Sequence, residues 1–329
     1  MAFSRSSYAF FALVLLSLLA SGCGRSNPSY VVAPQADAPA KTSTSEDAYA
    51  VIAQLHKSET SAPAPQPAPA APEVKSAPKA EPKFDAKGVS VDLTEIDGFE
   101  GVSDADFAKW QSVKVVRGKG LLTKGALETF AKIPQLKEFL WTESSIESDA
   151  ADQFAAVVQK SSVAKIRLQG LCVANQADRV FPTFALAALA QSPSLVDLDV
   201  SGSALDVARE FAKVDLTKSF PKLEKLNLYQ TNAGDAGVDA ILPLANRLTW
   251  LNLDDAGISP ESASKIAQFT NLTFLHVGRS TLDDASVLQF AALTKLEKIH
   301  ITRSAATEEG ADALRKALPN CVVVSQPEN

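Results

Sequence analysis

A short aliphatic phrase recurs along the last two-thirds of the chain. Its first, fourth and sixth positions hold Leu, Ile or Val, and polar or aromatic residues stand between them. The clearest copies are Leu223/Leu226/Leu228, Leu248/Leu251/Leu253, Leu272/Leu275/Val277 and Leu296/Ile299/Ile301. These copies begin 25, 24 and 24 residues apart. Since a fixed period of this length is typical of stacked repeats, the pattern predicts one small unit repeated along a solenoid.

Weaker copies extend the pattern towards both ends of the repeat region. They are Ala86/Val89/Val91, Trp110/Val113/Val115, Leu136/Phe139/Trp141, Val163/Ile166/Leu168, Leu195/Leu198/Val200 and a final half-copy, Cys321/Val324. Together the copies predict about ten stacked strands, with Cys321 as a buried thiol at a core position. The longest interval, 32 residues between the copies that begin at 163 and 195, predicts an insertion there.

The second half of each unit has the spacing of a helix. After Asp283-Asp284, apolar residues follow at steps of three, at 287, 290 and 293. Ser259 before Pro260 indicates a helix N-cap followed by the first helical residue. Thr307-Glu308-Glu309 repeats this cap and places acidic side chains at the positive end of a helix. Each unit is therefore predicted to run from strand to helix and back, with right-handed crossovers between parallel strands.

One copy carries a family resemblance. Leu223-Glu224-Lys225-Leu226-Asn227-Leu228-Tyr229-Gln230-Thr231, which runs on to Gly234 and Gly237-Val238, resembles leucine-rich repeats of the 24-residue type, with Thr or Ser at position nine. The resemblance covers residues 85–325. It implies an α/β fold, a right-handed leucine-rich repeat solenoid with parallel strands on the concave face and helices on the convex face. Members of this family mostly bind proteins, but a fold alone does not fix a function.

The first 22 residues have the pattern of a secretory signal peptide. Arg5 gives the segment a positive charge near its start. The apolar run Tyr8–Ala20 is too short for a membrane-spanning helix, which needs about 20 residues. The run leads into Leu19-Ala20-Ser21-Gly22-Cys23, which resembles the lipobox of bacterial lipoproteins, although Ala20 stands where Leu is commoner. The resemblance implies that residues 1–22 are a lipoprotein signal peptide and that Cys23 carries a lipid. It also implies an anchored protein at the cell envelope, at the outer membrane or on the periplasmic side. An ordinary cleaved signal is the alternative.

Residues 23–84 differ in composition from the repeats. Between residues 61 and 84, Pro stands at 63, 65, 67, 69, 72, 78 and 82, interleaved with Ala. Such a stretch favours extended polyproline II over a packed core. We therefore predict a lipidated, disordered tether over 23–84, a repeat domain over 85–325 and a short tail over 326–329.

The residues between the leucines predict a binding surface. Positions three and five of each strand point away from the core, onto the predicted concave face. Position three reads Glu138, Lys165, Asp197, Lys225, Trp250, Phe274 and Lys298, and position five reads Leu140, Arg167, Asp199, Asn227, Asn252, His276 and His300. Charges alternate in the first half, which predicts a self-compensated ladder that only supports the scaffold.

Aromatic and basic residues gather in the second half of the same face, and these residue types anchor interfaces. We call the predicted binding surface the concave patch; it consists of Tyr229, Trp250, Phe274, His276, Arg279, His300 and Arg303. The alternative is that the rings only pack on one another, or that an insertion covers them. His276 and His300 could share Zn²⁺ with Asp254 or Asp255, or respond to pH. Because the two acidic residues lie at the edge, where solvent is expected, we predict no metal and no cofactor.

Charge and motifs exclude several functions. The chain has 38 acidic and 32 basic residues and no basic stripe, which excludes nucleic acid as a partner. It has no nucleophile elbow, phosphate loop or zinc-protease motif, and Gly118-Lys119-Gly120 is predicted to be a turn. We therefore expect no catalytic residues and no small-molecule substrate. The prediction is a lipid-anchored module that binds an unknown protein partner at the envelope. The alternatives are a structural envelope component, through self-association or cell-wall contact, and an accessory enzyme with an atypical site.

Overall fold

The computed structural model describes residues 80–326. This part of the chain forms one sheet of 12 strands, and only β1 (Lys83–Phe84) is antiparallel to its neighbour, β2 (Ser90–Asp92). The order then follows the sequence through β3 (Val115–Leu122), β4 (Glu138–Ile146), β5 (Lys165–Leu168), β7 (Asp197–Asp199), β8 (Lys225–Asn227), β9 (Trp250–Asn252), β10 (Phe274–His276), β11 (Lys298–His300) and β12 (Val322–Val324). β6 (Cys172–Val173) pairs with β4 beside this path. The signal peptide, the lipid site at Cys23 and most of the tether lie outside the described residues.

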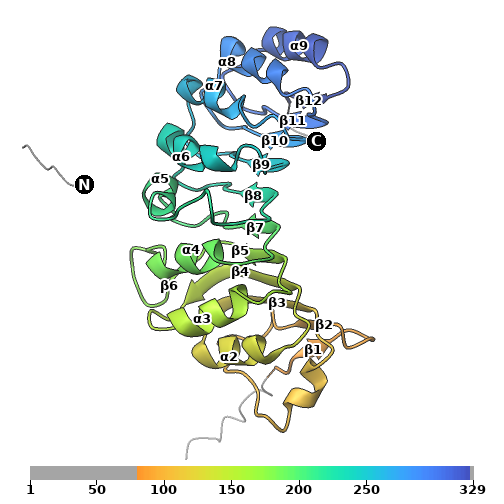
Figure 1. Ribbon diagram of the computed structural model, residues 1–329, viewed down its shortest axis with the longest axis vertical. Helices are drawn as coiled ribbons and strands as arrows, with labels where there is room; N and C mark the ends of the chain where they lie inside the picture. The colour runs from red at the N-terminus through yellow and green to blue at the C-terminus, as the bar shows by residue number, and fades with distance from the viewer. Residues whose placement is uncertain (1–79, 327–329) are drawn as a thin grey trace, which may run out of the picture. The chain divides into compact units, whose positions relative to one another are not determined.

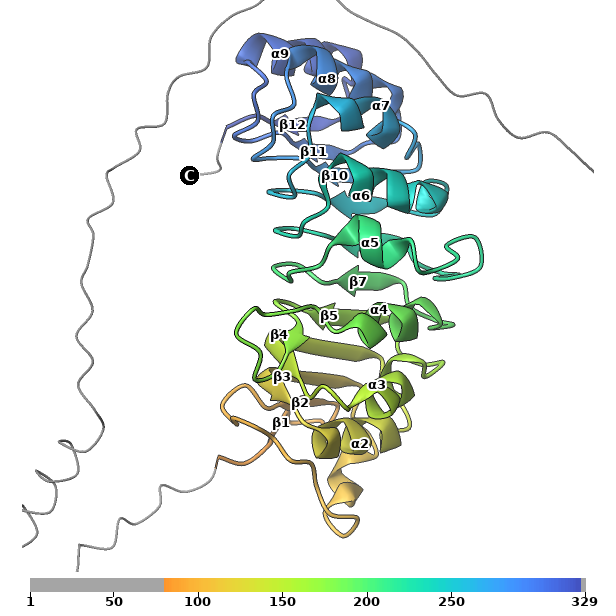
Figure 2. The same ribbon diagram turned by 90° about the vertical axis from the view of Figure 1, so that its left-hand side faces the viewer.

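Helices cover one side of the sheet (Figures 1 and 2). They are α2 (Lys124–Lys132), α3 (Ala151–Val158), α4 (Thr183–Ala190), α5 (Val207–Phe211), α6 (Gly234–Ile241), α7 (Ala263–Ile266), α8 (Asp284–Leu288) and α9 (Glu308–Ala317). Short 3-10 helices stand at η1 (Phe107–Trp110), η2 (Leu242–Leu244), η3 (Pro260–Ser262) and η4 (Gln289–Ala292). Within residues 80–326, no helix has the length and the apolar character needed to cross a membrane. The described residues thus form the α/β leucine-rich repeat solenoid that the sequence predicts.

The predicted helix starts are confirmed. Thr307 caps α9 by accepting a hydrogen bond from the Gly310 N–H at 3.3 Å, and Asp283 caps α8 in the same way from the Ser286 N–H at 2.9 Å. Ser259 caps η3, with Pro260 at the first helical position. These side chains satisfy backbone donors that have no partner inside the helix.

The aliphatic phrase builds one continuous core. Leu226, Leu251 and Leu275, at position four of three successive strands, are fully buried. No unit could bury this surface alone, so each repeat depends on its neighbours for its stability. Polar contacts add to this coupling: Asp284, in the first turn of α8, accepts hydrogen bonds from the N–H and the hydroxyl of Thr307, the cap of the next helix, at 2.6 and 2.8 Å.

The same turn recurs at position eight of successive repeats; it follows the strand from β5 onward and lies within β3 and β4. The residue at position eight has a positive φ in successive repeats; it is Glu143, Gly170, Gly202, Gln230, Asp255, Arg279 or Arg303. One residue later, the hydroxyls of Thr231, Ser280 and Ser304 each donate to the carbonyl of position six, at 2.7 Å. The hydroxyl preferred at position nine therefore closes the turn and fixes where position-eight side chains leave the sheet edge.

The predicted register is wrong in the first two copies. Val115 pairs with Glu138, so position one of that strand is Val113 and not Trp110. Position six is then Gly118, where a Cβ would overlap the Trp141 ring of the next strand. The large ring occupies the space of the missing aliphatic side chain, and this substitution hid the register. Gly118-Lys119-Gly120 consequently lies within β3 and is not a turn.

The copy that begins the stack is shifted by two residues. Val91 and Leu93 are fully buried at positions four and six, in place of Val89 and Val91. Between β2 and β3 the chain forms the 3-10 helix η1 and no α-helix. β1 and β2 form an antiparallel pair that caps this end of the described sheet. Lys83 and Phe84 belong to this cap, so the first strand begins within the segment predicted as the tether.

The last copy is shifted by one residue. Val322 pairs with Lys298, so Val323 takes the inward position four and is 8% exposed. Cys321 is accordingly half-buried, and the prediction of a core thiol at position one is wrong. The shift turns Val322 and Val324 outward, onto the face that carries the concave patch.

Candidate functional site

The strand register places the patch columns as the sequence predicts. Trp250 pairs with Phe274, which pairs with Lys298, and His276 pairs with His300. All five side chains are half-buried on the face of the sheet that points away from the core. We call this face the concave face, as in the sequence prediction.

Four patch residues form a cluster of rings. The rings of Trp250 and Phe274 stack with centroids 4.8 Å apart and planes only 5° from parallel. The Phe274 ring lies 5.6 Å from that of His300, which lies 4.7 Å from that of His276. The rings pack on one another, as expected if they served only to stabilise the fold. They also remain partly exposed to solvent, as a binding surface requires.

Among the described residues, the longest insertion joins the sheet far from these rings. The longest insertion contributes β6, which pairs with β4, far along the strand order from β9 and β10. The explanation in which this insertion covers the aromatic side chains is therefore not supported by the strand pairing.

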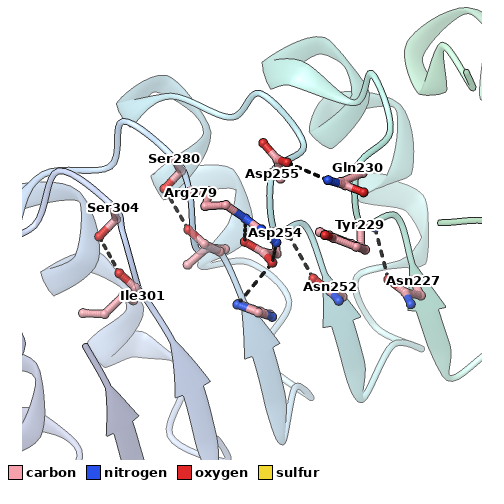
Figure 3. A network of polar contacts seen from close by, with 12 residues as sticks. Asn227, Tyr229, Gln230, Asn252, Asp254, Asp255, Arg279, Ser280, Ile301 and Ser304 are labelled. Atoms are coloured by element: carbon pink, nitrogen blue, oxygen red, sulfur yellow. Dashed lines mark hydrogen bonds and ion pairs between the residues drawn. The ribbon is translucent and has the colours of Figure 1, made fainter. Parts of the chain in front are cut away.

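An ion pair between a buried carboxylate and a half-buried arginine lies beside the ring cluster. Asp254 follows β9 and is only 5% exposed, and Arg279 follows β10. The Arg279 guanidinium donates from Nε to Asp254 Oδ1 at 3.1 Å and from Nη2 to Oδ2 (Figure 3). The same guanidinium lies over the Tyr229 ring, 5.0 Å from its centroid. Two donors and an aromatic face thus hold Arg279 in one position.

The burial of Asp254 corrects the sequence interpretation, which placed this carboxylate in solvent at the edge. The reason is a glycine that follows the next strand, β10. A Cβ at Gly278 would lie 2.9 Å from Asp254 Oδ1 and 3.0 Å from His276 Nε2. Because Gly278 has no side chain, the carboxylate can lie between the two strands, where Arg279 reaches it.

His276 is uncharged at neutral pH. Its Nε2 lies 3.6 Å from Asp254 Oδ2 and, within the described residues, is buried without a hydrogen-bond partner. Removal from water lowers the pKa of His276 to about 4, although the nearby Asp254 carboxylate opposes this shift. Neighbouring positive charge on Arg279 lowers the pKa further. The ring is therefore a neutral part of the patch surface.

The edge of the patch is more exposed. Arg303 lies at position eight of the last full repeat, with φ 57°, and its side chain is exposed. Asp255 is also exposed and accepts a hydrogen bond from Gln230 Nε2 at 3.1 Å (Figure 3). Six of the seven predicted residues therefore lie in contact within two small groups. Arg303 stands one repeat further on, at the position that Arg279 has in its own repeat.

Two residues of this face were missed from the sequence. Val322 and Val324 continue the columns of Lys298 and His300, and Val322 is 59% exposed. The signal was present in the run of three valines after Cys321, since a buried Val323 requires exposed neighbours on either side. The patch thus extends to the last strand.

The charge ladder of the other half is confirmed in part. Arg167 Nε donates to Asp199 Oδ2 at 3.0 Å, and Lys165 Nζ lies 3.6 Å from Asp197 Oδ2. Glu138 lies in register beside Lys165, and Lys225 beside Asp197, so opposite charges alternate along this half of the concave face.

Metal ligation by the histidine pair meets a specific obstacle. Both carboxylate oxygens of Asp254 already accept hydrogen bonds from Arg279, so this residue cannot ligate a metal without losing its partner. Among residues 80–326, no group of three or more His, Cys, Asp or Glu side chains is arranged to hold a metal ion.

Comparisons with known proteins reveal similarity only at low identity. No family model matches the chain, and no curated protein matches it in sequence. A leucine-rich repeat protein of Leptospira interrogans is 16% identical, with a TM-score of 0.42, over 70% of this chain and 59% of that one. Internalin C2 of Listeria monocytogenes is 15% identical, with a TM-score of 0.43, over 67% of this chain and 84% of that one. A Bacteroides fragilis protein is 17% identical, with a TM-score of 0.41, over 69% of this chain and 79% of that one. This chain thus spans little more than half of the Leptospira protein.

Proposed function

We propose that this chain is a lipid-anchored binding module of the cell envelope and that its repeat domain binds a protein partner through the concave patch. The anchor and the location rest on the sequence of residues 1–23. The binding role rests on one observation above all: the stacked rings of Trp250 and Phe274 stand half-exposed on the concave face.

Large aromatic side chains beside arginine dominate the binding energy of many interfaces. The patch is also rigid before any partner arrives, because Arg279 is held by Asp254 and Tyr229 and the rings hold one another. A surface that is already ordered loses less conformational entropy on binding. These features support recognition of a protein surface more than catalysis.

The test is a double substitution, Trp250→Ala with Phe274→Ala. Partner recovery after cross-linking in intact cells should fall at least tenfold while the thermal unfolding midpoint changes by only a few degrees. Lys165→Ala, on the same face but in the charge ladder, is the matched control and should leave recovery unchanged. Loss of folding without a specific loss of partner would contradict the proposal. Cross-links only between copies of this chain would indicate the structural alternative.

The anchor is tested separately. Cys23→Ala should move the protein from the membrane fraction to the soluble fraction and abolish incorporation of radioactive palmitate. Retention of the label in the variant would contradict lipidation at Cys23.

A further inference from the structure

Two glycines leave a gap in the row of position-eight side chains. Position eight is Gly170 in one repeat and Gly202 in the next, both with positive φ, between Glu143 and Gln230. An open cleft of about 360 Å³ occupies this place, lined by positions seven and eight of four successive repeats and by Arg179 of the longest insertion. This volume lies in the range of sites that hold small ligands.

The insertion brings a guanidinium into the gap. Its hairpin is closed by the Val173 N–H, which donates to the Val180 carbonyl at 2.8 Å. From this hairpin Arg179 Nη2 donates to the Gly170 carbonyl at 3.1 Å and lies 3.3 Å from the place of a Cβ at Gly170. Among residues 80–326, Arg179 has no acidic partner. Most of its five N–H donors are therefore available to a ligand.

Another turn of the same row shows how a guanidinium is satisfied there. Arg279, at position eight, pairs through two donors with the carboxylate of Asp254, at position seven of the preceding repeat (Figure 3). In the cleft, position seven is Ser201, and Arg179 has no such carboxylate beside it. Ser201 is only 3% exposed, yet its hydroxyl has no hydrogen-bond partner within the described part of the chain. A ligand carboxylate between Arg179 and Ser201 would satisfy both groups.

Glu143 balances the charge of the cleft. Its side chain is exposed, lines the cleft one repeat before Gly170, and has no partner among the residues that the structure describes. A simple anion would be repelled by Glu143, and a simple amine would be repelled by Arg179. A molecule that carries both charges matches the two side chains.

We propose that the cleft binds an amino acid as a zwitterion. The carboxylate of the amino acid accepts from the Arg179 guanidinium and the Ser201 hydroxyl, and its ammonium group donates to Glu143. Neighbouring repeats stand about 4.8 Å apart, so the two charges of the site are close enough to hold the two charged groups of one amino acid. The side chain of the ligand extends towards Tyr229, at the other end of the cleft. The stacked rings of the concave patch do not line the cleft, so this ligand is independent of the proposed protein partner.

Titration calorimetry with free amino acids provides the test. The full-length chain in detergent is titrated with the common L-amino acids and their D enantiomers. We expect at least one of them to bind. Its amide, which lacks the carboxylate, and its N-acetyl derivative, which lacks the ammonium group, should each bind at least tenfold more weakly. Absence of binding by every amino acid, or a blocked derivative that binds as tightly as its parent, would overturn the inference.

Variants identify the contacts. Arg179→Gln should weaken binding at least tenfold, and this variant should bind the amino acid and its amide equally, because the partner of the carboxylate is gone. Glu143→Gln should likewise no longer distinguish the amino acid from its N-acetyl derivative. Two controls should bind the amino acid normally: Arg303→Gln, the same change at an exposed position eight outside the cleft, and the double variant Trp250→Ala, Phe274→Ala. Binding that Arg179→Gln leaves intact would overturn the assignment to the cleft and would leave the proposed function untouched.

Discussion

Arg279 and Asp254 form a two-point ion pair across neighbouring repeats, with Nε donating to Oδ1 at 3.1 Å and Nη2 donating to Oδ2. The two residues stand 25 positions apart, one repeat length, at the ends of β9 and β10. The carboxylate is 5% exposed, so Arg279 replaces most of the solvent around it as a polar partner. The pair also positions Arg279 over Tyr229 and shapes the edge of the concave patch.

Removing the arginine should destabilise the protein. Arg279→Ala leaves the buried Asp254 carboxylate without its charged partner, and we expect the free energy of unfolding in urea to fall by about 2–4 kcal/mol. Arg303→Ala, at the equivalent position of the next repeat, removes an exposed side chain. This substitution should change the free energy of unfolding by less than about 0.5 kcal/mol. Equal effects of the two substitutions would contradict the role given to the ion pair.

Stability should fall in mild acid because of His276. Its pKa is about 4 in the folded protein and 6.5, the ordinary value, in the unfolded chain, so the unfolded chain binds the proton more readily between these values. The contribution of neutral His276 to the free energy of unfolding is complete above pH 6.5, its pKa in the unfolded chain. This contribution declines as the pH falls and is smaller by about 2 kcal/mol at pH 5.

The comparison is with His276→Gln, which cannot titrate. Urea unfolding of both proteins at pH 7.5, 6 and 5 should give a smaller loss of stability on acidification for the variant. Parallel pH profiles would show that His276 keeps an ordinary pKa in the folded state.

Gly278 should tolerate no side chain. A Cβ there would lie 2.7 Å from the Thr302 carbonyl oxygen, as well as against Asp254 and His276. We expect Gly278→Ala to lower the free energy of unfolding by about 1–3 kcal/mol. A Cβ at Gly257 would meet nothing within 4 Å, and φ there is 73°, so Gly257→Ala should show only the backbone strain, about 1 kcal/mol. A smaller effect at Gly278 than at Gly257 would be inconsistent with the packing described.

Arg315 protects the open edge of the sheet. It extends from α9 to donate to the carbonyl of Val323 at 3.3 Å and to the hydroxyl of Ser325 at 2.9 Å. β12 is the last strand of the described sheet, and an unprotected edge strand pairs readily with another chain. Arg315→Ala should therefore increase self-association at high protein concentration in sedimentation velocity, whereas Lys316→Ala on the same helix should not. An unchanged sedimentation profile for Arg315→Ala would contradict this protective role.

The sequence predicted the middle of the stack well because the same core positions recur there at a nearly constant interval. From Glu138 to His300, every outward column has the predicted register, since leucines at fixed positions must all point into one core. The ends differ for two separate reasons: β3 has neighbours on both sides but has glycine at position six, and β12 is the last strand of the described sheet. The Trp141 ring fills the space above Gly118, and Val323 takes the core position that the sequence predicted for Val324.

The polar centre of the site was harder to predict for a different reason. The burial of Asp254 requires the absence of a side chain at Gly278 and the presence of Arg279, both in the following repeat. The residues of the repeat that contains Asp254 do not by themselves show that its side chain is buried. The signal lies in two successive repeats: Asp254 stands at position seven of one, and Gly278 and Arg279 stand at positions seven and eight of the next. Comparing these positions would have revealed the pairing.

The central claim is that the concave patch contacts a partner, and photo-crosslinking in intact cells tests it most directly. A benzophenone amino acid placed at Lys225, next to the rings, should yield one defined cross-linked protein that disappears when Trp250 and Phe274 are both alanine. The same probe at Lys316, on the convex helix α9, should not yield it. An identical cross-linking pattern from both positions, or one that survives the loss of both rings, would contradict the account.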